Sequence, residues 1–142
     1  MNGNTELLNY IYQNSQMGVL TISQLLEIVT DKEFQTVLKE QLREYKIFHH
    51  KSKELLNQHG LDEKGLSRME KVRTNFMIDI QTMNDKSSNH IAEMMMTGST
   101  MGIINALRNS RKYKDAEKNI LDLMKNLLHM EEKNFEELKK FV

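Results

Sequence analysis

Residues 25–38 read LLEIVTDKEFQTVL and place four polar residues, Thr30-Asp31-Lys32-Glu33, between two apolar stretches. A threonine followed three residues later by a glutamate is typical of a capping box, which satisfies free backbone N–H groups at a helix start. This motif predicts that one helix ends and the next begins with almost no loop between them. A connection this short makes the two helices antiparallel neighbours.

Apolar residues recur at helical spacing on both sides of this turn. The preceding helix is expected to begin near Asn4 or Thr5, because either side chain can accept a hydrogen bond from a free N–H group. The following helix is expected to end at Gly60, since glycine suits the left-handed conformation that closes many helices. Both helices are therefore predicted to be long.

The second half of the chain carries two further apolar patterns of helical period. A third helix is predicted from Asp62 to about Met96, and a fourth is predicted to start at Asp115. The glycine-flanked stretch 98–102 is interpreted as a break. A short extra helix, which includes Ile103 and Ile104, is expected between the third and fourth helices.

The composition agrees with a helical protein, because the 142 residues include no proline and only six glycines. Proline interrupts helices, so its absence permits long ones. The length suits one domain covering residues 1–142. The predicted fold is an all-α, antiparallel up-down-up-down four-helix bundle with one short additional helix.

Several classes of function are disfavoured by charge and composition. The 20 basic and 20 acidic residues balance, so no net field attracts nucleic acid or an anionic membrane. The longest apolar runs are far shorter than the roughly 20 residues that span a bilayer, and residues 1–6 lack the pattern of a signal peptide. The absence of cysteine suits a reducing compartment. We therefore expect a cytoplasmic protein without nucleic-acid or membrane partners.

Glu131 is the most unusual residue of the last predicted helix, because it falls on the apolar stripe. A carboxylate on a core face is costly unless hydrogen bonds or a charge compensate it. Counting residues from the helix ends places Asn14, Tyr45 and His49 near its level. We predict that Glu131 faces the interior and bonds to one or more of them. The cluster is interpreted either as a buried polar network that fixes helix register or as a pocket for a ligand or a single metal ion.

A second unusual feature is the run Met94-Met95-Met96. Three consecutive helical positions cover about 200° of the helix surface, so the core cannot hide all three side chains. Ile103 and Ile104 also need burial. Either the segment after residue 102 folds back over the methionines, or a homodimer buries this region. We predict the homodimer, and another protein partner is also possible there.

Four parts of the sequence resemble uncharacterised bacterial proteins of ferritin-like type. These are YQNSQMG at residues 12–18, Glu44-Tyr45, SNHIAEMMMTGSTMGI at residues 88–103, and Glu131-Glu132-x-Asn134. The resemblance implies a ferritin-like four-helix bundle, and it brings no established activity with it.

Metal-binding ferritin-like proteins carry Glu-x-x-His motifs that converge on the metal. This chain has no such motif, although the reversed order occurs in His90-x-x-Glu93 and His129-x-x-Glu132. The leading hypothesis is therefore a non-enzymatic bundle protein with a structural or interaction role, no catalytic residues and no cofactor. The alternatives are an atypical iron- or manganese-binding protein or oxidase, and a carrier of a small apolar ligand.

Overall fold

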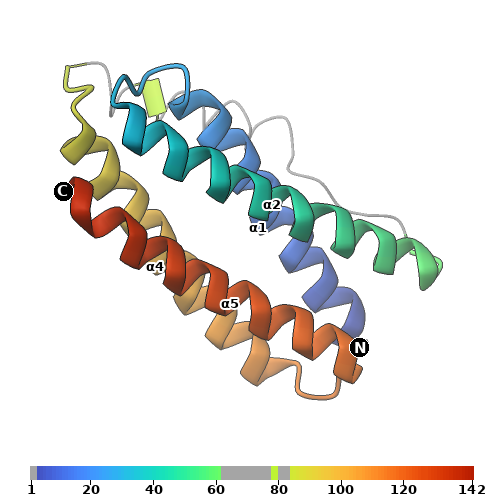
Figure 1. Ribbon diagram of the computed structural model, residues 1–142. Coiled ribbons are helices and arrows are strands. Elements are labelled where there is room, and N and C mark those ends of the chain that lie inside the picture. Colours follow the sequence, from blue (N-terminus) through green and yellow to red (C-terminus); the bar gives the residue numbers. More distant parts are fainter. Residues whose placement is uncertain (1–2, 62–77, 80–83) are drawn as a thin grey trace.

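A computed structural model describes residues 3–61, 78–79 and 84–142 (Figure 1). Its secondary structure comprises α1 (Gly3–Leu25), α2 (Lys32–Gln58), α4 (Ser88–Lys112), α5 (Lys118–Leu138) and a final 3-10 turn, η1 (Lys139–Phe141). These regions contain no strand. The all-α class predicted from the sequence is confirmed for this part of the chain.

The turn between α1 and α2 forms where the sequence predicts it, with one change of residue. Asp31, rather than Thr30, caps α2, because its Oδ1 accepts a hydrogen bond from the Phe34 backbone N–H at 2.8 Å. The side-chain amide of Gln35 donates a hydrogen bond to the Val29 carbonyl at 2.7 Å and so links the start of α2 to the residues that follow α1. At the other end of α2, Gly60 adopts the predicted left-handed conformation, with a φ of 71°.

Contacts at the two ends of the bundle fix the directions of the helices. At one end, the Asn4 side chain accepts a hydrogen bond from the Glu117 backbone N–H at 2.7 Å, and His59 lies 3.2 Å from the Glu117 carboxylate. At the opposite end, the rings of Phe34 and Phe141 stack with centroids 4.4 Å apart. The helices α1 and α2 therefore form one antiparallel pair, and α4 and α5 form another (Figure 1).

The predicted up-down-up-down order is wrong for these helices, because α2 and α4 run in the same direction (Figure 1). That prediction assumed a third helix directly after Gly60 and antiparallel to α2. The predicted helix start at Asp62 lies outside the described residues, and α4 begins only at Ser88. The Ser87 hydroxyl caps α4 by accepting from the His90 N–H at 3.4 Å.

The predicted break at residues 98–102 is also wrong, since α4 continues through them to Lys112. Ile103 and Ile104 belong to α4, and no separate short helix contains them. A glycine in a helix interior costs only about 1 kcal/mol relative to alanine, which packing can offset. Gly102 is buried on the inner side of α4, with Ser99 and Ala106 on the same face.

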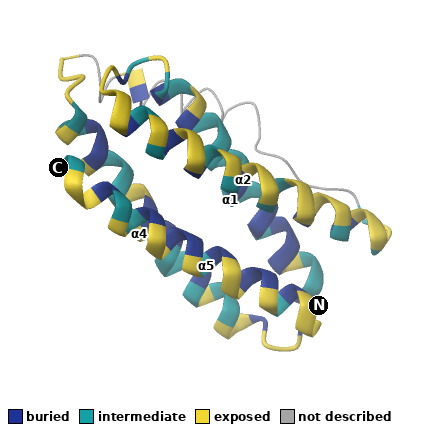
Figure 2. Ribbon diagram, in the orientation of Figure 1, coloured by how far each residue is buried: buried dark blue, intermediate teal, exposed yellow. Residues whose placement is uncertain are grey.

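The core follows the facing sides of the four helices, with exposed residues on the outer sides (Figure 2). Its largest fully buried side chains come from all four, with Leu7 and Phe34 in the first pair and Ile91 and Leu127 in the second. Several polar side chains, Glu131 among them, are buried with this apolar set. None of the described helices combines the length and apolar character needed to cross a bilayer.

Candidate ligand-binding site

Glu131 lies in the interior of the bundle, with 2% of its surface exposed. The helical period of α5 places it there, because Leu127, Asn134 and Leu138 on the same face are also buried. The position agrees with the apolar stripe in the sequence. The carboxylate consequently meets side chains from the other helices rather than water.

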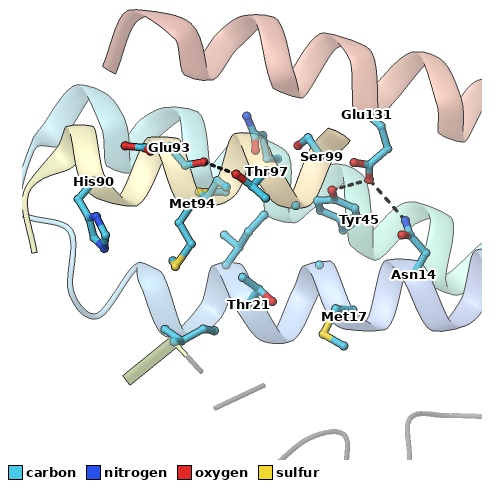
Figure 3. Close-up of a pocket in the computed structure, with 16 residues that line it drawn as sticks. Asn14, Met17, Thr21, Tyr45, His90, Glu93, Met94, Thr97, Ser99 and Glu131 are labelled. Carbon is cyan, nitrogen blue, oxygen red and sulfur yellow. Dashed lines mark hydrogen bonds between the residues drawn. The ribbon is translucent and has the colours of Figure 1, made fainter. Parts of the chain in front are cut away.

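Two side chains hydrogen-bond to one oxygen of this carboxylate (Figure 3). The Tyr45 hydroxyl of α2 donates to Glu131 Oε1 at 2.5 Å, and the Asn14 amide of α1 donates to the same atom at 3.4 Å. The structure thus brings three of the four predicted cluster residues together. The ring of the fourth, His49, packs on Tyr12 with centroids 4.4 Å apart.

Two helical glycines make room for this arrangement. A Cβ atom added at Gly18 of α1 would lie 2.5 Å from a ring carbon of Tyr45. A Cβ atom added at Gly102 of α4 would lie 2.8 Å from Glu131 Oε2. Sequence reasoning missed both roles, although a glycine that persists within a helical apolar pattern is a signal for close packing.

Burial is the main electrostatic influence on the site. It raises the pKa of Glu131 above the usual 4.5, while the hydrogen bonds from Tyr45 and Asn14 oppose that rise. Burial, followed by the nearby Glu131 charge, also raises the pKa values of Tyr45 and Tyr10. Both phenols therefore stay protonated at neutral pH. The Tyr10 hydroxyl donates a hydrogen bond to the Gly102 carbonyl at 3.3 Å, which ties α1 to α4.

Asn134 is a further buried polar residue that sequence reasoning did not include in the cluster. It lies close enough to Tyr45 to lower the pKa of the phenol, and none of its surface is exposed. Among the described residues, neither polar atom of its amide makes a hydrogen bond of good geometry. A buried polar group without a hydrogen bond costs about 1–3 kcal/mol of stability. The Asn134 amide therefore has unused hydrogen-bonding capacity.

A pocket of about 560 Å³ extends from Glu131 along α1 and α4 (Figure 3). Its volume lies within the range of about 300–1,000 Å³ that is usual for small-molecule sites. Glu131, Tyr45 and Asn14 lie at one end, and His90 lies at the other (Figure 3). The described lining residues are Asn14, Met17, Gly18, Thr21, Ile22, Gln41, Tyr45, Ile78, His90, Glu93, Met94, Met95, Thr97, Gly98, Ser99 and Glu131.

The methionine run contributes to this pocket as well as to the surface. Met94, Met95 and Met96 are half-buried against the core, and the first two line the pocket. Ile103 and Ile104 are half-buried on the same helix. The segment after residue 102 does not fold back over the methionines, because it continues α4.

The two reversed His/Glu motifs occupy different places. His129 and Glu132 face the solvent, where their side chains approach to 3.6 Å. His90 and Glu93 line the pocket at the end away from Glu131 (Figure 3). Within residues 3–61, 78–79 and 84–142, no three His, Asp or Glu side chains are grouped so that they could hold a metal ion.

Comparison of the chain with protein-family models, curated proteins and solved structures finds no match. The functional interpretation therefore comes from the geometry of the pocket and its buried carboxylate.

Proposed function

We propose that this chain is a non-enzymatic, cytoplasmic four-helix bundle protein of ferritin-like type that carries a small amphipathic molecule. The pocket of about 560 Å³ is the observation behind the proposal. Met17, Ile22 and Met94 supply apolar wall, while Glu131 and Tyr45 make one end polar. Ligand sites typically combine an apolar lining with a few polar groups that orient the ligand.

The helix directions support the ferritin-like part of the proposal. Bundles of that type contain one long crossover, which lets two successive helices run in the same direction. Here α2 and α4 share a direction, and residues 59–87 separate them in the sequence. Three residues from the motifs that resemble ferritin-like proteins, Asn14, Gly18 and Glu131, line the pocket, and a fourth, Gly102, packs against Glu131.

A carrier explains the site better than a purely structural role does. A polar network that only fixes helix register needs hydrogen bonds, but it does not need an adjoining cavity. Protein interiors are packed at a density that leaves few voids larger than a water molecule. Methionine side chains adapt to irregular apolar shapes, so Met17, Met94 and Met95 suit a wall that closes around a ligand.

Binding of the neutral fluorescent probe N-phenyl-1-naphthylamine tests this proposal with two matched variants. Thr97 and Thr100 are both exposed residues of α4, but only Thr97 lines the pocket. Each hydroxyl donates to the carbonyl four residues earlier, at 3.1 Å for Thr97 and 2.9 Å for Thr100. The two substitutions therefore remove the same local hydrogen bond.

We expect saturable binding to the wild-type chain with one site per chain. Thr97→Trp should weaken binding at least about tenfold by occupying the pocket, and Thr100→Trp should leave it unchanged. Absence of saturable binding to the wild type would contradict the proposal, as would equal binding by the two variants.

A further inference from the structure

We infer that the ligand is a linear primary alkylammonium ion, whose head group pairs with Glu131 Oε2 while its chain lies along the methionine and isoleucine wall. The inference rests on the proposed function and specifies the class of molecule carried. It follows from the hydrogen bonds of the carboxylate, the charge of the pocket lining and the shape of the pocket.

One oxygen of the carboxylate accepts no hydrogen bond from the described residues. Oε1 accepts from both Tyr45 and Asn14, whereas no described residue donates to Oε2. An ionised carboxylate can accept about four hydrogen bonds, so the site uses half of that capacity. Oε2 packs against the backbone of Gly102, where an added Cβ atom would lie 2.8 Å from it.

No described residue supplies a cation to the buried charge. Its hydrogen-bond donors among the described residues are a phenol and an amide, and neither carries a positive charge. A buried carboxylate is stabilised most effectively by a hydrogen-bonded positive group. An ammonium head group supplies that charge together with three N–H donors. The ligand would then complete an ion pair for which the protein provides one half.

The lining selects a cation over an anion. The described lining contains two acidic residues, Glu93 and Glu131, and no lysine or arginine, and its one histidine, His90, lies at the end away from Glu131 (Figure 3). A cavity lined by one sign of charge concentrates ions of the opposite sign. An alkyl carboxylate of the same length would bring a third negative charge and should be excluded.

The shape of the pocket favours a linear chain. Its lining on α1 runs from Asn14 to Ile22, which are eight residues apart and so span about 12 Å along the helix. On α4 it runs from His90 to Ser99 over a similar distance. Met17, Ile22 and Met94 lie along this path, where they can contact methylene groups.

Isothermal titration calorimetry with three eight-carbon compounds tests the inference. n-Octylammonium, 1-octanol and octanoate share the chain and differ in head-group charge. The wild-type protein should bind the ammonium ion at least about tenfold more tightly than the alcohol, and octanoate should not bind measurably. These comparisons need no substitution, so they do not depend on the folding of a variant.

Glu131→Gln tests the assigned residue, because glutamine preserves the shape and an acceptor for Tyr45 but removes the charge. It should bind the ammonium ion and the alcohol equally, with the alcohol bound as in the wild type. Glu132→Gln is the matched control, because the adjacent Glu132 faces solvent beside His129, and it should behave like the wild type.

If the wild type binds the alcohol as tightly as the ammonium ion, or if Glu131→Gln keeps the preference, this inference is wrong and the carrier proposal stands. If none of the three compounds binds although N-phenyl-1-naphthylamine does, this inference is also wrong and the carrier proposal stands. If that probe does not bind either, both are wrong.

Discussion

Replacing Gly102 by alanine should destabilise the protein, whereas the same replacement at Gly98 should stabilise it. Both glycines lie inside α4, so alanine gives the helix a similar gain of about 0.5–1 kcal/mol at each position. The surroundings differ. A Cβ at Gly98 would meet no atom within 4 Å, but a Cβ at Gly102 would lie 2.8 Å from Oε2 and 3.0 Å from Cδ of Glu131.

The net effect at Gly102 follows from what Glu131 must give up. The carboxylate has to move away from the new methyl group, which stretches its 2.5 Å hydrogen bond with Tyr45. A hydrogen bond to a charged group contributes about 1.5–3 kcal/mol. Subtracting the helix gain of about 0.5–1 kcal/mol leaves a loss of roughly 0.5–2.5 kcal/mol. For Gly98→Ala only the gain remains.

Urea unfolding followed by circular dichroism measures both variants, and thermal unfolding should shift by roughly 3 °C per kcal/mol for a chain of this size. Adding Gly102→Ala to a Glu131→Ala background provides the control. Without the carboxylate the methyl group has space, so the substitution should become stabilising. The reasoning is refuted if Gly102→Ala is as stable as Gly98→Ala in the otherwise wild-type chain.

Three other predictions follow from the site and from the methionine run. Gly18→Ala should lower the free energy of unfolding by about 1–3 kcal/mol in urea titrations, because its Cβ would lie 2.5 Å from the Tyr45 ring. Burial raises the pKa of Glu131 above 4.5, so the folded chain holds this proton more tightly than the unfolded chain. The free energy of unfolding should therefore fall as pH rises from 4.5 through the folded pKa, and Glu131→Gln should remove that part of the pH dependence in urea titrations. Light scattering should give a dimer mass for the wild type and a smaller mass for Met95→Glu and Met96→Glu; a monomeric wild type would reject the dimer.

The sequence was informative where rigid helices carry a periodic pattern. Glu131 could be placed in the core because its neighbours on the α5 stripe are apolar. Asn14 and Tyr45 could be placed at its level because a helix advances by a constant 1.5 Å per residue. His49 lies one turn beyond Tyr45, and its ring packs on Tyr12, a contact that helix spacing alone does not indicate.

Other features depend on packing between helices, which the apolar pattern along one helix does not encode. The two glycines of residues 98–102 look like a break in the sequence, yet Gly102 continues the helix because the Glu131 carboxylate fills the space beside it. The shared direction of α2 and α4 depends on where the next long helix begins after Gly60. The pocket lies between side chains of α1, α2, α4, α5 and Ile78, so no single stretch of sequence predicts its volume.

Methyl NMR of protein labelled at its methionine methyl groups tests the central claim most directly. Met17, Met94 and Met95 line the pocket, whereas Met101 is 50% exposed on α4 and is not part of the lining. Saturating n-octylammonium should shift the methyl signals of the three lining residues and leave the Met101 signal in place. Unchanged signals from all three, or a Met101 shift as large as theirs, would contradict binding in this pocket.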